Sequence, residues 1–131
     1  MPAMTIQSQR LLGVSILLVE DDDDNREILA TFLRHAGATV TTTAAAQEAF
    51  EIFKADRPSF IVTDIAMPQR DGIWLLEAVR AMPGPPVHVI AVTAHAMGGQ
   101  RDRIQAARFE AYLVKPLEPE DLIVIIEQLK P

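Results

Sequence analysis

The sequence predicts an α/β protein with a five-stranded parallel β-sheet and helices on both faces of the sheet. Short, continuous apolar runs, which are typical of strands buried on both faces, alternate with segments in which apolar residues recur at helical spacing. This strand–helix alternation occurs five times along the 131 residues. Parallel strands joined by helices need right-handed crossovers, and these place helices on both sides of one sheet.

The first two strand–helix units lie in the first half of the chain. Residues 16–19 are a continuous apolar run, and the helix that follows ends at Gly37. β-branched residues predict a second strand over residues 39–43, and the next helix closes before Pro58. The apolar faces of these two helices are formed by Ile28, Leu29, Phe32, Leu33 and Ala36, and by Ala45, Ala46, Ala49, Phe50 and Phe53.

The other three units follow the same alternation. The third strand covers residues 60–63 and ends at Asp64, and a loop with the turn-forming pairs Met67-Pro68 and Asp71-Gly72 follows it. The remaining elements are a helix with Ile73, Leu75, Leu76 and Val79 on one face, a proline-rich break at 83–86, a strand over 87–92, a more polar helix from about 97 to 107, a strand over 111–114 and a helix over 121–129.

Length and composition indicate one domain that folds around a core, since 49% of the residues are hydrophobic. The chain has no cysteine, which excludes a disulfide scaffold, a thiolate metal site and a cysteine nucleophile. No apolar run approaches the ~20 residues of a membrane span, and the N-terminus lacks the pattern of a signal peptide. We therefore expect a cytoplasmic protein without membrane contact, with residues 1–13 as an N-terminal tail or linker and residues 14–131 as the domain.

The acidic charge is concentrated at one place. Twelve basic residues face 18 acidic ones, and five of the acids are consecutive at positions 20–24. The rest of the chain, with 13 acidic and 12 basic residues, is nearly neutral. Such a concentration predicts a cation site. A direct nucleic-acid partner is not expected, because no basic excess is present to neutralise phosphates.

Polar residues stand at the carboxyl ends of four predicted strands, where open α/β sheets bind their ligands. Glu20 and Asp21 follow the first strand, Asp64 the third, Thr93 the fourth and Lys115 the fifth. Carboxylates held close together repel unless a proton or a cation lies among them, and Mg²⁺ suits a site of oxygen ligands. A metal, a lysine and a hydroxyl can hold the oxygens of a transferring phosphoryl group, and an aspartate can be its nucleophile.

These residues lie in four motifs that resemble the receiver domain of two-component response regulators. The motifs are Leu17-Leu18-Val19-Glu20-Asp21-Asp22, Val62-Thr63-Asp64-Ile65-Ala66-Met67-Pro68 with Asp71-Gly72, Val92-Thr93-Ala94, and Tyr112-Leu113-Val114-Lys115-Pro116. The match covers about residues 14–130, with the motifs in the family's order and spacing. The resemblance implies a flavodoxin-like, doubly wound sheet with strand order 2-1-3-4-5 and five helices.

The resemblance also implies roles for the residues at the strand ends. Asp64 is expected to be the phosphoacceptor. Mg²⁺ is expected to bind Asp21, Asp64 and the backbone carbonyl of Ala66 directly, and Glu20 mostly through water. Lys115 is expected to form the ion pair of the site, and its bond to the following proline is expected to be cis.

Other residues are expected to bind the phosphoryl group or to respond to it. By resemblance, Thr93 and the amide of Ala94 bind phosphoryl oxygens, and Tyr112 is the switch aromatic that turns inward when Thr93 moves. Ala66 and His95 flank the site and are expected to tune the lifetime of the phosphorylated state. Ala66 has no polar group to hold a water, whereas His95 either orients the water, contacts the phosphoryl oxygens or is simply exposed.

Three local interpretations accompany these roles. Asp22, Asp23 and Asp24 are best explained as acids that cap the following helix and favour its dipole. Arg101, Arg103 and Arg108 could bind a partner, but a solvated helical face is the better explanation for them. Arg108 stands where the family often has glycine, so a positive φ there would cost up to ~1 kcal/mol relative to glycine.

We expect a signalling receiver and not an enzyme. It would take a phosphoryl group from a phosphohistidine on a histidine kinase or a histidine phosphotransfer domain, and then bind a downstream protein through its fourth helix, fifth strand and last helix. A free-standing regulator and a receiver excised from a hybrid histidine kinase both fit the sequence.

Three other functions fit the sequence less well. A haloacid-dehalogenase-type phosphohydrolase needs a second aspartate two residues after the nucleophile, where this chain has Ala66. An FMN carrier needs a phosphate-binding loop after the first strand, where the acids at 20–24 would repel phosphate. A degenerate receiver that serves only as a scaffold would lack some of the phosphorylation residues, and all of them are present.

Overall fold

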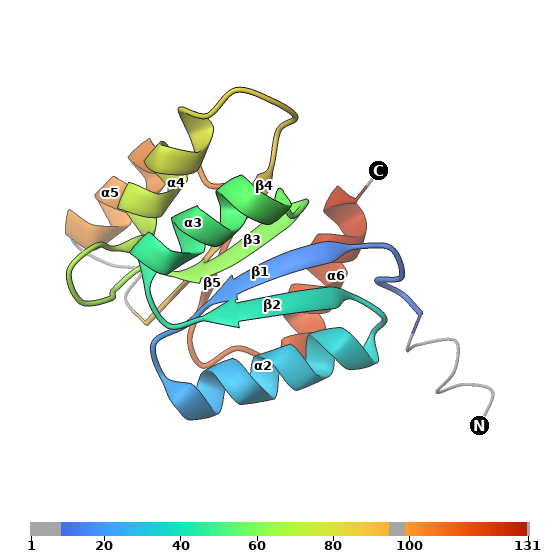
Figure 1. Cartoon of the computed structure of the whole chain (residues 1–131). Coiled ribbons are helices and arrows are strands. Elements are labelled where there is room, and N and C mark those ends of the chain that lie inside the picture. Colours follow the sequence, from blue (N-terminus) through green and yellow to red (C-terminus); the bar gives the residue numbers. More distant parts are fainter. Residues whose placement is uncertain (1–8, 95–98, 131) are drawn as a thin grey trace.

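The computed structural model describes residues 9–94 and 99–130, and this part of the chain forms a parallel sheet with helices on both faces (Figure 1). All four strand pairs are parallel, and the strand order is β2-β1-β3-β4-β5, which confirms the predicted order. The strands are β1 (Ser15–Val19), β2 (Thr39–Thr43), β3 (Phe60–Asp64), β4 (His88–Thr93) and β5 (Ala111–Val114). The helices are α2 (Asp23–His35), α3 (Ala46–Asp56), α4 (Gly72–Arg80), α5 (Gly99–Ala107) and α6 (Pro119–Leu129).

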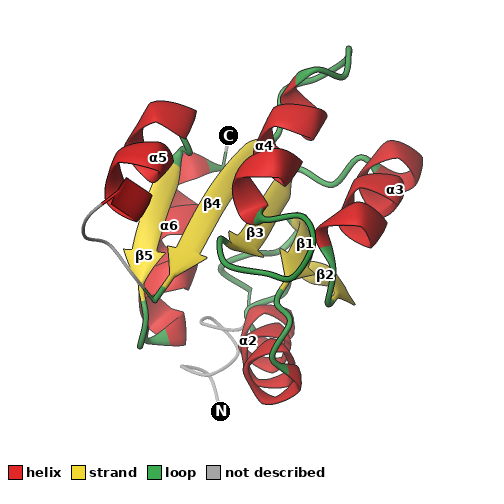
Figure 2. Ribbon diagram, turned by 90° about the vertical axis from the view of Figure 1, so that its left-hand side faces the viewer, coloured by secondary structure: helices red, strands yellow, loops and turns green. Residues whose placement is uncertain are grey.

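The helices form two layers, with α2 and α6 on one face of the sheet and α3, α4 and α5 on the other (Figures 1 and 2). Along β1 the side chains alternate between these layers. Ile16 and Leu18 belong to the core under α2 and α6, whereas Leu17 and Val19 belong to the core under α3 and α4. The continuous apolar runs of the sequence are therefore strands that are buried on both faces.

The ends of the helices follow local sequence signals. α6 begins at Pro119, two residues before the predicted start, because the fixed φ of proline suits the first helical position. Gly37, with a φ of 103°, follows the C-cap residue Ala36 of α2 and lets the chain turn into β2. Arg108 has a φ of 63° in the turn between α5 and β5, so a non-glycine residue does occupy a left-handed position there.

The segment before β1 packs onto the domain. Leu11 has no exposed surface, belongs to the core under α2 and α6, and its N–H donates to the carbonyl oxygen of Ala36 at 2.7 Å. Arg10 forms ion pairs with Glu120 and, at 2.9 Å, with Glu127 on α6. Of the residues that we predicted to be a tail or linker, residues 1–8 lie outside the described part, and at least residues 10 and 11 contribute to the packed domain.

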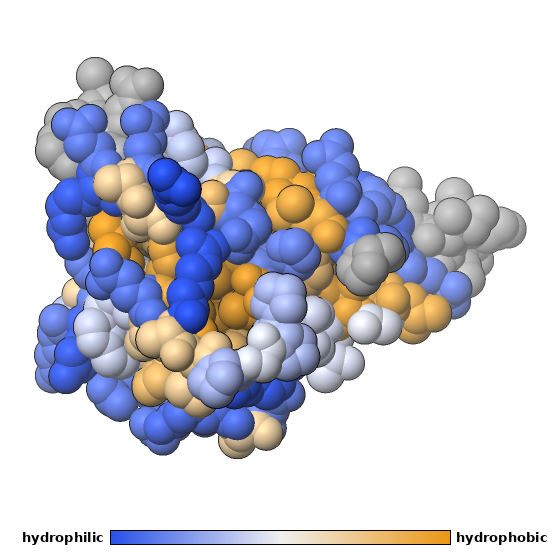
Figure 3. Space-filling model, turned by 90° about the horizontal axis from the view of Figure 1, so that it is seen from above, coloured by the Kyte–Doolittle hydropathy of each residue, from blue (hydrophilic) through white to orange (hydrophobic). Residues whose placement is uncertain are grey.

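The surface carries apolar side chains beside the charged ones. Seen from above, apolar residues gather in the middle of the molecule and polar residues lie around them (Figure 3). Partly buried apolar side chains also pack against the cores on the two faces of the sheet. In the described residues, no helix combines the length and the apolar character that crossing a bilayer requires.

Candidate functional site

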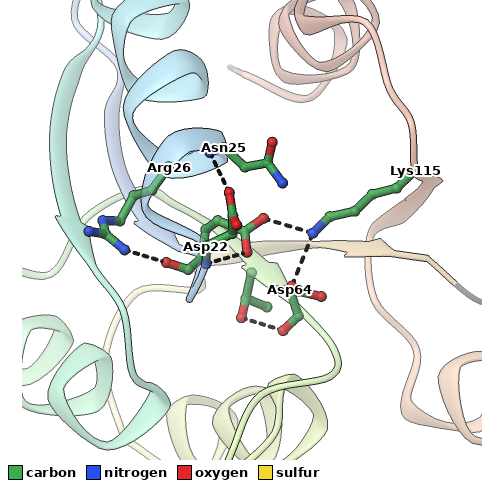
Figure 4. Close-up of polar contacts among 7 residues, drawn as sticks. Asp22, Asn25, Arg26, Asp64 and Lys115 are labelled. Atoms are coloured by element: carbon green, nitrogen blue, oxygen red, sulfur yellow. Dashed lines mark hydrogen bonds and ion pairs between the residues drawn. The ribbon is translucent and has the colours of Figure 1, made fainter.

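Three polar residues from separate strands meet at the carboxyl end of the sheet, as predicted (Figure 4). The Lys115 Nζ, after β5, lies 2.8 Å from Oε1 of Glu20, after β1, and 3.1 Å from Oδ2 of Asp64, at the end of β3. Glu20 is 2% exposed and Asp64 is 8% exposed, so both carboxylates lie inside the protein. A buried charge needs a partner, and one lysine serves both carboxylates.

The carboxylates of Glu20, Asp21 and Asp64 form an acidic cluster. Each residue offers one oxygen, and these oxygens all lie within 4.8 Å of one another. Partial burial raises the pKa of the Asp21 carboxyl, and the hydrogen bond and charge of Glu20 raise it further. This close set of hard oxygen ligands has the chemistry that Mg²⁺ takes in proteins.

Lys115 is held in its charged form. Burial alone would lower the pKa of its ammonium group, but the hydrogen bonds to Glu20 and Asp64 outweigh burial and raise this pKa above its usual value. The peptide bond from Lys115 to Pro116 is cis, as expected. The backbone N–H of Lys115 also donates to the carbonyl oxygen of Thr93 at 2.7 Å, which ties the end of β5 to the end of β4.

The loop between β1 and α2 is ordered by its own carboxylates. Asp22 is the N-cap of α2, and its Oδ2 accepts from the N–H of Asn25 at 2.8 Å, which confirms the capping interpretation for this acid. The N–H of Asp22 donates to Oε2 of Glu20 at 3.1 Å. Asp23 and Asp24 occupy the first turn of α2, where the helix dipole favours negative charge.

The loop after Asp64 packs tightly against the end of β3. The Oγ1 of Thr63 donates to the carbonyl oxygen of Asp64 at 2.9 Å, and the N–H of Gly72 donates to the carbonyl oxygen of Ile65 at 3.0 Å. Asp71 caps α4 by accepting from the N–H of Trp74. Ala66 is exposed in this loop, two residues after Asp64.

The residues predicted to respond to a phosphoryl group lie at the ends of β4 and β5. Thr93 is buried at the end of β4, and Ala94 after it is exposed. Tyr112 is 40% exposed on β5. The structure therefore brings Glu20, Asp64 and Lys115 into contact, whereas His95 lies outside the described residues.

A cavity of about 440 Å³ opens beside Lys115, between the start of α2 and the segment that leads into α6. Its walls are mostly apolar, with Glu20 and Lys115 among the polar groups that reach it. The other residues that line it are Asn25, Ile28, Leu29, Pro116, Leu117 and Pro119. An open, mostly apolar cavity therefore adjoins the acidic cluster.

Two arginines near the site make contacts that were not predicted from the sequence. Arg26 donates to the backbone carbonyl oxygen of Glu20 in the β1–α2 loop and pairs with Asp23 in α2. An arginine three residues after an acid in a helix is a sequence signal for the pair with Asp23. Arg103 of α5 is exposed, as expected for a solvated helical face, and its guanidinium also forms an ion pair with Asp71 at 2.9 Å. These residues are 32 positions apart, and nothing local in the sequence indicates their contact.

Comparison with known proteins agrees with this geometry. Residues 16–127 match the family model of the response regulator receiver domain. The chain belongs to this family. Receiver domains are signalling modules that interact with histidine kinases or phosphotransfer partners. The strand order of this receiver domain is the one predicted for the family.

Relatives of this receiver domain occur alone and within longer proteins. An uncharacterized 14.6 kDa protein of Leptolyngbya boryana is 38% identical over 121 residues, which are 92% of each chain. The signal transduction histidine-protein kinase BarA of Escherichia coli is 33% identical over 92% of this chain, but the match spans 13% of BarA. Response regulator Rre1 of Synechocystis is 33% identical over 88% of this chain and 51% of its own length.

Solved structures show the same fold. The receiver domain of a sensor histidine kinase of Pseudomonas aeruginosa, with a magnesium ion coordinated in its active-site cleft, is 33% identical and superimposes with a TM-score of 0.82, covering 88% of this chain and 96% of that one. The chemotaxis protein CheY4 of Vibrio cholerae is 25% identical and gives a TM-score of 0.78, covering 89% and 98%. The predicted family and the predicted fold are thus confirmed.

Proposed function

We propose that this receiver domain accepts a phosphoryl group on Asp64 from the phosphohistidine of a histidine kinase or a histidine phosphotransfer domain, in a reaction that requires Mg²⁺. The observation that carries the proposal is the contact of Lys115 Nζ with Asp64 Oδ2 at 3.1 Å, inside a cluster that brings Glu20 and Asp21 to the same carboxylate. A buried aspartate with a lysine and a cation site beside it is equipped to act as a nucleophile toward a phosphoryl group.

Asp64 would supply the attacking atom. One of its carboxylate oxygens forms a bond to phosphorus while the phosphorus–nitrogen bond of the donor histidine breaks, and the imidazole nitrogen keeps that electron pair. Lys115 would stay close to the acceptor carboxylate and offset the negative charge of the phosphoryl oxygens. Thr93 and the amide of Ala94, at the end of the neighbouring strand, would donate hydrogen bonds to those oxygens.

Mg²⁺ would be held by Asp21, Asp64 and the backbone carbonyl of Ala66, and would neutralise charge on the phosphoryl oxygens. Glu20 would act through water. Its Oε1 already accepts from Lys115 and its Oε2 accepts from the N–H of Asp22, which supports an outer role for this carboxylate.

The response would pass from Thr93 to Tyr112. Thr93 is buried and Tyr112 is exposed on the edge strand β5, so an inward turn of the ring would change the surface formed by α5, β5 and α6. We propose this surface as the site for a downstream protein. In this role the domain is a signalling module and not an enzyme. Both a free-standing regulator and a receiver within a hybrid histidine kinase are compatible with its relatives, since the match spans 92% of the Leptolyngbya protein and 13% of the histidine-protein kinase BarA.

Phosphorylation with a small-molecule donor tests the proposal. Incubation with acetyl phosphate and MgCl₂ should add one phosphoryl group, detected by intact-protein mass spectrometry, and the Asp64→Asn variant should remain unmodified. Asp23→Asn is the matched control, because Asp23 is an exposed acid of the run at positions 20–24 that lies outside the acidic cluster, and this variant should still be labelled. Labelling of Asp64→Asn, or equal labelling when Mg²⁺ is removed with a chelator, would contradict the proposal.

A further inference from the structure

Arg26 approaches the β1–α2 loop from the side opposite Lys115 (Figure 4). Its Nη1 donates to the backbone carbonyl oxygen of Glu20 at 2.9 Å, and its Nη2 pairs with Oδ1 of Asp23 at 2.6 Å. The Arg26 side chain is 22% exposed, so most of it is packed against the protein. The guanidinium of Arg26, in the first turn of α2, therefore lies against the loop that precedes the helix.

These contacts fix the backbone on both sides of Asp21. Glu20 is held by its N–H, which donates to the carbonyl oxygen of Thr43, and by its own carbonyl oxygen, which accepts from Arg26. Asp22 is held by its N–H, which donates to Glu20, and by its carbonyl oxygen, which accepts from the N–H of Arg26. The carbonyl of Glu20 belongs to the peptide unit that joins Glu20 to Asp21. The hydrogen bond from Arg26 therefore sets the orientation of the Asp21 backbone and the direction in which its carboxylate leaves the chain.

Arg26 has two opposite effects on a cation at this site. Its positive charge repels Mg²⁺, whereas its hydrogen bond to Glu20 holds a proposed ligand in place. The charge is largely offset by Asp23, which is exposed, and exposed charges are screened by water and salt. Groups that orient metal ligands from outside the coordination shell typically change metal affinity by about 10- to 100-fold. The orienting effect should therefore exceed the repulsion.

We propose that Arg26 is a positioning residue for Mg²⁺ binding. It holds the Glu20–Asp21 peptide unit so that the Asp21 carboxylate faces Asp64 before the metal binds, although its own charge has the same sign as the metal. The inference rests on the proposed function, because it takes Asp21 as a ligand of Mg²⁺.

Isothermal titration of the unphosphorylated protein with MgCl₂ measures this role. Arg26→Ala should weaken Mg²⁺ binding about 10-fold or more, and Arg26→Lys should recover only part of the loss because one ammonium group replaces two separate guanidinium donors. Arg34→Ala is the matched control. Arg34 lies on the same helix about 12 Å further along and also donates to a backbone carbonyl, that of Val40 at 2.9 Å. Its loss should change Mg²⁺ affinity less than about 2-fold.

Two readouts separate positioning from general stability. In the absence of metal, the amide resonance of Asp21 should shift in Arg26→Ala and not in Arg34→Ala, and both variants should unfold cooperatively. Should Arg26→Ala fail to fold, Arg26→Lys decides alone. Unchanged or tighter Mg²⁺ binding by the Arg26 variants would overturn the inference and leave the proposed function standing. Absence of Mg²⁺ binding by the unsubstituted protein would overturn both.

Discussion

Gly72 lies directly against the backbone of Asp64. A β-carbon at position 72 would be 2.5 Å from the carbonyl oxygen of Asp64 and 3.2 Å from the Cα atom of Ile65, closer than packed atoms approach each other. Helix α4 can therefore begin where it does only because its first residue has no side chain. The backbone at the start of this helix is therefore packed directly against the backbone of the proposed phosphoacceptor.

We expect Gly72→Ala to lower the free energy of unfolding by about 1–3 kcal/mol, because backbone must move to admit the added methyl group. It should also slow phosphorylation of Asp64, since the displaced atoms belong to that residue. Urea unfolding and the rate of labelling by acetyl phosphate measure the two effects. Gly13→Ala is the control, since no atom lies within 4 Å of the added carbon and only its left-handed backbone is strained. A Gly72→Ala variant as stable and as fast as the parent would refute this explanation.

Lys115→Ala should destabilise the protein at neutral pH, by about 3 kcal/mol, because it leaves the buried carboxylates of Glu20 and Asp64 without their cation. A divalent cation can replace the lost charge. The increase in melting temperature on adding MgCl₂ should therefore be larger for this variant than for the parent. Lys54→Ala removes a lysine that pairs with Glu51 on the surface, and its response to MgCl₂ should equal that of the parent. Equal responses of all three proteins would count against a cation site at Lys115.

Glu127→Gln should destabilise the protein in a pH-dependent way. The hydrogen bond from Arg10 lowers the pKa of the Glu127 carboxyl in the folded state, so the ionised form contributes stability above the pKa of the unfolded chain. That contribution is lost as pH falls through the lowered folded-state pKa. The variant should therefore be less stable than the parent at pH ~7 and should approach it below pH ~4, near the reference value of a glutamate. Urea unfolding at both pH values measures the difference, with Glu51→Gln as the control, and a difference that persists in acid would exclude an ionic origin.

Ala66→Asn should shorten the lifetime of the Asp64 phosphoryl group, because the added amide can hold a water in line for attack. One interpretation of the sequence is that His95 orients this water. On that interpretation, His95→Ala should lengthen the lifetime of the phosphoryl group. The decay of the labelled protein in excess Mg²⁺, followed by mass spectrometry, measures both. Ala81→Asn, at the exposed end of α4, should decay at the parental rate. Parental decay in Ala66→Asn and His95→Ala would assign the lifetime to a partner phosphatase instead.

The parts of the fold that could be predicted are those with a local signal. Buried parallel strands must be continuously apolar, and helices that cover a sheet must be apolar on one side, so the order of elements follows from periodicity alone. The meeting of Glu20, Asp64 and Lys115 was predictable for a related reason. Each stands at the carboxyl end of a strand, and parallel strands bring these ends together although the residues are up to 95 positions apart.

The parts that could not be predicted depend on contacts between distant side chains. Arg103 and Asp71 meet because α5 packs beside α4, and neither helix has a sequence signal for that pair. The same holds for Arg10, whose partners Glu120 and Glu127 lie more than 100 residues away. The hydrogen bond from Arg26 to Glu20 is local, but its acceptor is a backbone carbonyl oxygen. Every residue has such an oxygen, so the residue types do not indicate this hydrogen bond.

The burial of Leu11 sets a limit on how this domain can be cut from or joined to other proteins. A fragment that started at Val14, where the apolar pattern of the sheet begins, would lack a fully buried leucine and leave a hole between α2 and α6. Loss of such a side chain costs about 2–5 kcal/mol, a large part of the stability of a small domain. Expression boundaries, affinity tags and fusion joints should therefore be placed before Gln9, so that Arg10 and Leu11 keep their contacts with the two helices.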